Sequence, residues 1–183
     1  MNESRKTAEI EITWSSKAVV GQIVGNEDPA DIADLIKKSL NSFHKTLTDE
    51  KGFYMLITTK PETRDIIFRP PLYIGIAYKQ PLGLRPGQEA GHEPAYDCII
   101  KNSIGKSLFI KLGIVTNSSL DKATKQLYED IEKCLICHNQ PTCNDMHKSN
   151  YNSSRELFIN NIGQFMSLNE KSHCAENMKC PEQ

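Results

Sequence analysis

Polar and apolar residues alternate near the start of the chain. Residues 9–14 change from polar to apolar at each step, which is the period of a half-buried strand. After a loop with two glycines, Asp28 and Pro29 form a favourable helix start. An aspartate caps the first backbone N–H groups, and proline suits the first helical position. The pattern therefore predicts a strand followed by a helix.

The helix that begins at Pro29 is expected to run for several turns, because its apolar residues recur at intervals of three and four. This spacing places them on one buried stripe. The stripe consists of Ile32, Leu35, Ile36, Leu40, Phe43 and Leu47. Lys37, Lys38 and Lys45 lie off the stripe and are expected on a solvated face.

Three later segments have the apolar content of strands. Residues 53–59 and 72–78 are separated by a polar, proline-bounded stretch, residues 61–71, so we expect these two strands to be antiparallel neighbours. Residues 107–115 place leucines and isoleucines on one face and predict a third strand.

The segments that follow the paired strands predict a loop and two helices. Residues 80–94 hold three prolines and three glycines and predict an irregular loop, and residues 95–102 predict a short helix. Ser118 or Ser119 is expected to cap a second helix. The inner stripe of that helix would be Leu120, Ala123, Leu127, Ile131 and Cys134. Glu132 lies beside this stripe rather than opposite to it.

The pattern weakens after Asn144. Residues 155–168 predict one edge strand, and the last fifteen residues are expected to be loose.

Composition limits the class of protein. With 183 residues, of which 38% are hydrophobic and 25% charged, the chain can bury one good core. The formal net charge of −1 does not suit binding to nucleic acid through bulk charge, so such a site must be a local patch. Residues 60–111 carry eight cationic and five acidic side chains, a mild basic surplus.

The chain shows no apolar run of signal-peptide length at its start and no run of the roughly 20 apolar residues that a membrane span needs. These absences predict a cytoplasmic protein that does not bind a membrane. In that compartment six cysteines are expected to be reduced thiols or metal ligands rather than disulfides.

A zinc site stays open as an alternative for the cysteine-rich end of the chain. Zinc requires four ligands on closely spaced residues. The candidates are Cys134, Cys137, His138, Cys143, His147, His173, Cys174 and Cys180. Against zinc, Cys134 falls on the apolar stripe of its helix, where a cysteine usually acts as a small buried hydrophobe.

Three motifs together resemble one family of nucleases. The first two are Gly52-Phe53-Tyr54 and Tyr73-Ile74-Gly75 on the paired strands. The third begins at Glu132 and continues through Leu135-Ile136 and Pro141 to Asn144. In this order and spacing, residues 50–145 resemble the GIY-YIG nuclease domain. The departures are a phenylalanine in the first motif, a long connection between the strands, and an arginine slightly further along than usual.

The resemblance implies a fold and a division of the chain. The expected fold is an α/β domain with a small, mostly antiparallel three-stranded sheet flanked by helices, preceded by an N-terminal strand–helix extension. Residues 1–49 would form that extension, residues 50–145 the catalytic domain, and residues 146–183 an edge strand with a loose tail.

The resemblance also implies roles for individual residues. Glu132 would hold Mg²⁺ or Mn²⁺, which prefer oxygen ligands. Arg85 would bind a phosphate oxygen pair, and Tyr54 would orient or deprotonate the attacking water, supported by Tyr73. His92 lies further past the arginine than the family's histidine and is a candidate for the same site.

Three further residues are candidates for substrate binding: Arg69, Lys79 and Asn144. The function that follows from the resemblance is a metal-dependent endonuclease (a hydrolase) that binds DNA and cleaves its phosphodiester bonds. Two alternatives stay open. One is a silent module of the same fold that binds nucleic acid or protein, and the other is a zinc-stabilised interaction protein.

Overall fold

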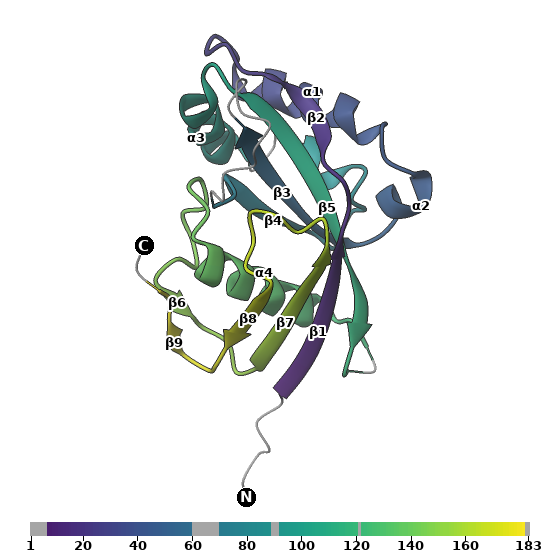
Figure 1. Cartoon of the computed structure of the whole chain (residues 1–183), viewed down its shortest axis with the longest axis vertical. Coiled ribbons are helices and arrows are strands. Elements are labelled where there is room, and N and C mark those ends of the chain that lie inside the picture. Colours follow the sequence, from purple (N-terminus) through teal and green to yellow (C-terminus); the bar gives the residue numbers. More distant parts are fainter. Residues whose placement is uncertain (1–6, 60–69, 89–91, 121, 182–183) are drawn as a thin grey trace, which may run out of the picture.

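The computed structural model describes residues 7–59, 70–88, 92–120 and 122–181 (Figure 1). The helices are α1 (Pro29–Leu40), α2 (Lys45–Thr48), α3 (Glu93–Ser103), α4 (Lys125–Asn139) and the short 3₁₀ helix η1 (Arg85–Gly87). The strands are β1 (Thr7–Trp14), β2 (Ala18–Gln22), β3 (Gly52–Thr59), β4 (Tyr73–Ala77), β5 (Ser107–Ser118), β6 (Asn150–Tyr151), β7 (Glu156–Gly163), β8 (Lys171–Cys174) and β9 (Met178–Lys179).

Seven of these strands form one mixed sheet, curled into a half-barrel, with the order β4-β3-β5-β1-β7-β8 and with β2 paired to β5. The remaining two, β6 and β9, pair separately. The expected three-stranded sheet with an N-terminal extension is therefore wrong. β1 lies inside the sheet, antiparallel to β5 and parallel to β7, so the first strand of the chain is a central part of the fold.

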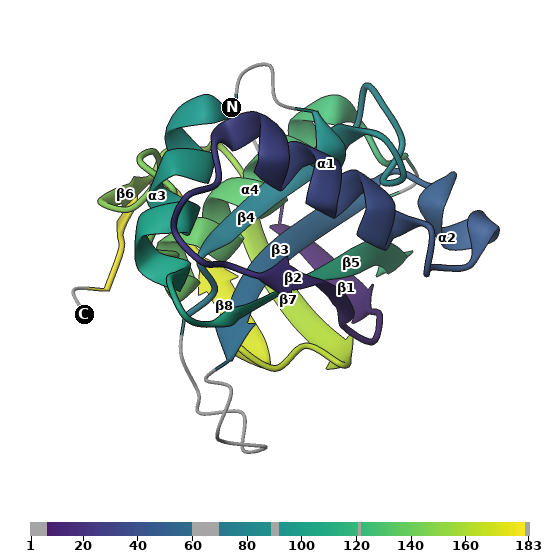
Figure 2. The same cartoon turned by 90° about the horizontal axis from the view of Figure 1, so that it is seen from above.

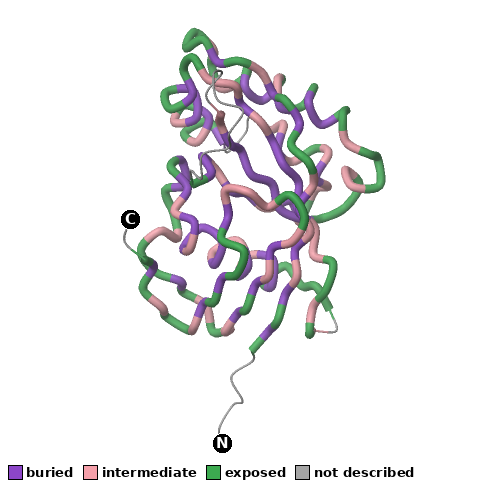
Figure 3. Tube along the Cα trace, viewed as in Figure 1, coloured by how far each residue is buried: buried purple, intermediate pink, exposed green. Residues whose placement is uncertain are grey.

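Helices cover the two sides of the curled sheet separately (Figures 1 and 2). On one side α1 and α3 pack on β2, β3 and β5, with Ile32, Ile36 and Tyr96 fully buried. On the other side α4 packs against β1, β3, β4 and β7, with Leu127 and Ile131 fully buried. The buried segments of the trace in Figure 3 mark these two layers. Among the described residues, no helix combines the length and apolar content of a membrane span.

The predicted start of α1 is confirmed in detail. The Asp28 side chain accepts from the Asp31 backbone N–H at 2.9 Å, and the Asp31 side chain accepts from the Asp28 N–H at 3.0 Å. This reciprocal pair stabilises a helix by about 1 kcal/mol. The helix ends at Leu40, earlier than the apolar stripe implied, and Leu47 lies in the separate helix α2.

The pairing of β3 with β4 is also confirmed. Phe53 lies opposite Ile76 and Met55 opposite Ile74, in an antiparallel register. The residues between the two strands, 60–69, lie outside the described part of the chain, and this includes Arg69.

The C-terminal part of the chain differs from its prediction. β7 was expected at an edge of the sheet, but it lies between β1 and β8. The last fifteen residues contain β8 and β9 instead of a loose tail. A buried hydrogen bond joins this part to the start of the chain, from the Trp14 Nε1–H to Asn161 Oδ1 at 2.8 Å. The indole lies over Gly113, where an added Cβ would come within 2.8 Å of the ring.

All six cysteines form disulfides, so the expectation of reduced thiols is wrong. The pairs are Cys98–Cys143, Cys134–Cys174 and Cys137–Cys180. The second joins α4 to β8, the third joins α4 to the residue after β9, and the first joins α3 to the loop after α4. Disulfides persist mainly in oxidising compartments. The cytoplasmic localisation stays a prediction that this pairing does not support.

Candidate functional site

The pairing of β3 with β4 sets the centre of the candidate site. Tyr54 lies directly opposite Gly75 in the register of the two strands. A Cβ at position 75 would overlap the Tyr54 ring and hydroxyl, so only glycine lets the tyrosine lie across the neighbouring strand. The glycine of the second motif is thus explained by packing, and the Tyr54 side chain is held in one position.

A chain of hydrogen bonds leads from Tyr54 to the loop before α3. The Tyr54 hydroxyl lies 2.9 Å from His92 Nε2, and His92 Nδ1 lies 2.6 Å from the carbonyl oxygen of Gln88. A carbonyl can only accept, so Nδ1 carries the hydrogen and Nε2 is free to accept from the tyrosine. Burial lowers the pKa of His92, which favours this neutral form.

Two further tyrosines complete the aromatic wall around His92. The rings of Tyr73 and Tyr96 lie with their centroids 6.1 Å and 5.3 Å from the imidazole. The Tyr96 hydroxyl donates to the Pro86 carbonyl at 2.5 Å and so fixes the loop that carries η1. Burial raises the pKa of Tyr73 to about 12 and raises that of Tyr54 well above its ordinary value, so both phenols are protonated in this structure.

Arg85 begins η1, and its guanidinium donates to the Gln88 side chain at 3.3 Å. Its positive charge lowers the pKa of Tyr54, Tyr73 and Glu132 against the effect of burial. Arg85 therefore lies close enough to all three groups to stabilise negative charge that develops among them.

Glu132 reaches the same site from α4. Burial is the main cause that raises the pKa of this carboxyl to about 7, and the charge of Glu129 adds to it. Arg85, Lys133 and a hydrogen bond from the Ile76 backbone oppose the shift. Such a carboxylate, held between a strand and a helix without full charge compensation, is suited to binding a cation.

Arg85 and Gln88 of the site also line a cavity of about 500 Å³, which we call the basic cavity. Its lining residues are Ile76, Tyr78, Lys79, Gln80, Arg85, Gln88, Lys125 and Glu129. Three of these are cations and one is an acid. Lys125 and Glu129 pair at 2.6 Å on the surface of α4. The cationic surplus would attract a polyanion to the mouth of the site.

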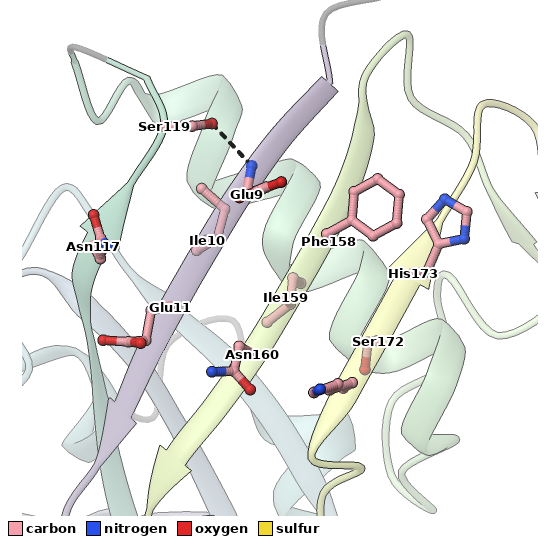
Figure 4. Close-up of a pocket in the computed structure, with 11 residues that line it drawn as sticks. Glu9, Ile10, Glu11, Asn117, Ser119, Phe158, Ile159, Asn160, Ser172 and His173 are labelled. Carbon is pink, nitrogen blue, oxygen red and sulfur yellow. Dashed lines mark hydrogen bonds between the residues drawn. The ribbon is translucent and has the colours of Figure 1, made fainter.

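A larger cavity of about 590 Å³ lies elsewhere, on the sheet face that points away from α4 (Figure 4). We call it the acidic cavity. Glu9 and Glu11 of β1 line it together with Lys171 and His173 of β8. The His173 ring stacks on Phe158 with the two centroids 4.2 Å apart. None of the residues expected at the nuclease site lies among its lining residues.

Comparison with known proteins adds nothing to this geometry. No family model, no curated protein and no solved structure matches the chain. The likeness to GIY-YIG nucleases therefore rests on the three motifs and on the positions of their residues.

The structure brings together most of the residues expected at the site. Tyr54 and His92 are in direct contact, Tyr73 lies beside them, and Arg85 and Glu132 act on their pKa values. His92 lies seven positions after Arg85 in the chain, and it still contacts Tyr54.

The remaining candidates are placed differently. Lys79 lines the basic cavity with Arg85. Asn144 is buried, and both polar atoms of its amide bond the backbone of Ile74, at 2.9 Å and 2.8 Å. This bidentate contact fixes β4 at the residue between Tyr73 and Gly75, and both polar atoms of the amide are used in it, so the geometry gives Asn144 a supporting role.

The sequence reasoning missed several residues that complete the site. Lys125 and Glu129 could have been found, because Glu129 precedes Glu132 by one helical turn and faces the same side. Gln88 and Tyr96 gave no comparable signal. Their positions in the site depend on how the segment before α3 folds. The hydrophobic periodicity of the sequence does not predict that.

Proposed function

We propose that this chain is a metal-dependent endonuclease that hydrolyses DNA phosphodiester bonds at a GIY-YIG-type site. The observation that carries the proposal is the hydrogen bond between the Tyr54 hydroxyl and His92 Nε2, made beside Arg85 and Glu132. Hydrolysis of a phosphodiester needs a group that takes a proton from water and groups that bear negative charge. The site holds both kinds of group.

The residues present fit a hard divalent cation such as Mg²⁺ or Mn²⁺. Glu132 offers a carboxylate whose pKa is raised by burial and by Glu129, so a cation bound there would relieve an unfavourable charge. A metal ion in this position supplies stabilisation of the charge on the leaving oxygen.

Tyr54 and His92 can move the proton of the attacking water. As water attacks phosphorus, its proton passes to the Tyr54 oxygen, and the tyrosine proton passes to His92 Nε2. The bond between phosphorus and the leaving 3′ oxygen then breaks, that oxygen takes a proton from solvent water, and His92 returns its proton to solvent. Gln88 keeps the other ring nitrogen protonated, so the imidazole presents its basic nitrogen to the tyrosine.

Arg85, Lys79 and Lys125 are the phosphate-binding groups in this proposal. Arg85 lies nearest to the tyrosines and would bind the phosphate that reacts. Lys79 and Lys125 line the same cavity and would bind neighbouring phosphates of the strand. Their contacts are to the backbone of the nucleic acid, so they provide affinity without sequence preference.

A nicking assay tests the proposal. Purified protein is incubated with supercoiled plasmid and with branched DNA, in the presence of Mg²⁺ or Mn²⁺ or of a chelator. We expect nicked product only with metal. Protein that binds the DNA with Mg²⁺ and Mn²⁺ present but never cuts it would contradict the enzyme and favour the silent binding module.

A further inference from the structure

We propose that Cys134, His138 and Cys174 form a zinc site once the disulfide between the two cysteines is reduced. Within the described part of the chain, these three form a group of potential metal ligands whose donor atoms all lie within 4.8 Å of one another. Cys134 and His138 are four residues apart on α4 and share one face, and Cys174 approaches them from β8.

The distances between the three donor atoms would suit zinc after small movements of the side chains. Tetrahedral Zn²⁺ with bonds of about 2.3 Å to sulfur and about 2.0 Å to nitrogen places its ligand atoms about 3.5 to 3.8 Å apart. The Cα atoms of Cys134 and Cys174 are 5.9 Å apart, so both thiolates can reach one ion. Three protein ligands leave a fourth position, which a water molecule fills in sites of this kind.

A hydrogen bond to the backbone of His173 holds His138 in a tautomer that can bind a metal ion. Its Nε2 lies 2.8 Å from the carbonyl oxygen of His173 and must donate to it, so Nδ1 of the neutral ring keeps its lone pair. Ligating histidines usually donate their second nitrogen in this way, which fixes the tautomer. His138 is half-buried while both cysteines are buried, so an ion would enter from the side of the imidazole.

The structure excludes several of the cysteines and histidines that the sequence suggested as zinc ligands. The Cys98–Cys143 disulfide lies between α3 and the loop after α4, and its thiols do not belong to the group. The side chain of His173 points to the opposite face of the sheet, where it pairs with Glu156 at 2.9 Å and stacks on Phe158 (Figure 4).

The chemistry requires a two-electron reductant, and a dithiol is one class that can supply it. The dithiol is oxidised to its own disulfide, and the bond between the Cys134 and Cys174 sulfurs is replaced by two thiols. Zinc then displaces the two thiol protons and binds the thiolates together with the neutral imidazole. A second disulfide that accepts two electrons by thiol–disulfide exchange reverses the step, which releases the ion and restores the bond between the two sulfurs. The site would therefore bind zinc only in reducing conditions.

Metal analysis of the full chain tests the proposal. A phosphine serves as reductant, because it does not compete for zinc as a dithiol does. We expect one zinc per chain after reduction and none at this site in oxidised protein, with cobalt giving thiolate-to-metal absorption. Replacing both Cys134 and Cys174 by serine should abolish binding, whereas replacing both Cys98 and Cys143 should not.

The two histidines provide a matched pair of variants. His138→Ala should weaken zinc binding by about 100-fold or more, since loss of a ligand exceeds loss of a second-shell partner. His173→Ala keeps its backbone carbonyl and should change affinity little. Reduced protein that binds no zinc, or that stays unfolded by circular dichroism with zinc present, would overturn the proposal. Equal effects of the two histidine variants would do the same.

Discussion

The two cavities of this protein differ in a way that their sizes do not reveal. The acidic cavity is larger, about 590 Å³ against about 500 Å³, yet it is lined by the exposed side of a sheet. Glu9 and Glu11 would repel a phosphate there. The basic cavity is lined by Arg85, whose charge acts on four groups with pKa values shifted by burial: Tyr54, Tyr73, His92 and Glu132.

The difference teaches that buried titratable groups, rather than volume, distinguish a candidate catalytic site. Charged side chains such as Glu9 and Lys171 lie on the open sheet face, in contact with solvent. Side chains between β3, β4 and α4 lose water, and their protonation then depends on one another. If this comparison is right, changes at the basic cavity affect catalysis, and matched changes at the acidic cavity do not.

The largest effect is expected for Glu132→Gln. The amide keeps the shape but loses the charge that would hold the metal ion, so cleavage should fall by about 10⁴-fold while DNA binding is kept. Plasmid nicking and a binding titration measure the two quantities. Glu11→Gln makes the same chemical change in the acidic cavity and should cleave like the wild type. A Glu132→Gln protein that cuts at a comparable rate would refute the proposed site.

Tyr54→Phe should reduce cleavage by about 10³-fold, because the ring still fills its place over Gly75 but no longer transfers a proton. The matched control is Tyr151→Phe. Tyr151 is buried too, and its hydroxyl donates to the Arg155 carbonyl at 2.8 Å, away from the site. We expect a loss of about 1 kcal/mol in stability from the control and no loss of turnover. Equal rates for the two variants would contradict the proton path.

Glu132→Gln should lower cleavage but raise the stability of the metal-free protein at high pH. The folded pKa of about 7 lies above the ordinary value of 4.5, so the folded state holds a proton that the unfolded state releases. Without metal, wild-type stability is therefore lost as pH rises from about 4.5 to about 7. At pH 8 Glu132→Gln should be more stable than the wild type by about 3 kcal/mol at most, and at pH 4 about equal.

Urea denaturation at the two pH values, with a chelator present, measures this difference. Cleavage by the wild type should rise with pH up to about 7, because ionised Glu132 is needed for the metal. A stability difference between the two proteins that does not change with pH would show that Glu132 is not held in an unfavourable environment.

The smallest effect is expected for Lys79→Ala combined with Lys125→Ala. Each lysine lost removes about one phosphate contact, so the slope of log affinity against log salt should fall by about 2. Filter binding over a salt series measures the slope. Lys171→Ala, in the acidic cavity, should leave the slope unchanged, and a similar change in both proteins would place the DNA elsewhere.

Local signals in the sequence predicted part of the local structure correctly, but the expected cap of α4 at Ser118 or Ser119 was wrong, because Thr124 caps that helix. Asp28 and Pro29 begin α1 as expected, because capping depends on residues three positions apart. The alternation in β1 and the antiparallel pair β3–β4 were also correct. The site residues on those strands could be proposed because motif spacing and strand pairing both act over short distances.

Long-range pairing could not be predicted from one sequence. The strand β2 was read as loop, since Gly21 and its neighbours carry a weak pattern and the strand forms only by pairing with β5. The disulfides were missed because the start of the chain was taken to indicate a reducing compartment. Even if disulfides are assumed, six cysteines allow 15 sets of pairings, and the spacing of the cysteines in the sequence does not identify the correct set.

The parallel pairing of β1 with β7 has a consequence for synthesis. β1 is made before the other described strands, but its partners are β5 and the much later β7, whose last pair joins Trp14 to Gly163. Until β7 is made, one edge of β1 has no neighbour. Such non-local strands fold slowly and expose aggregation-prone edges meanwhile. Truncation within β7 should therefore reduce solubility during expression, although β7 contributes no residue to the candidate site.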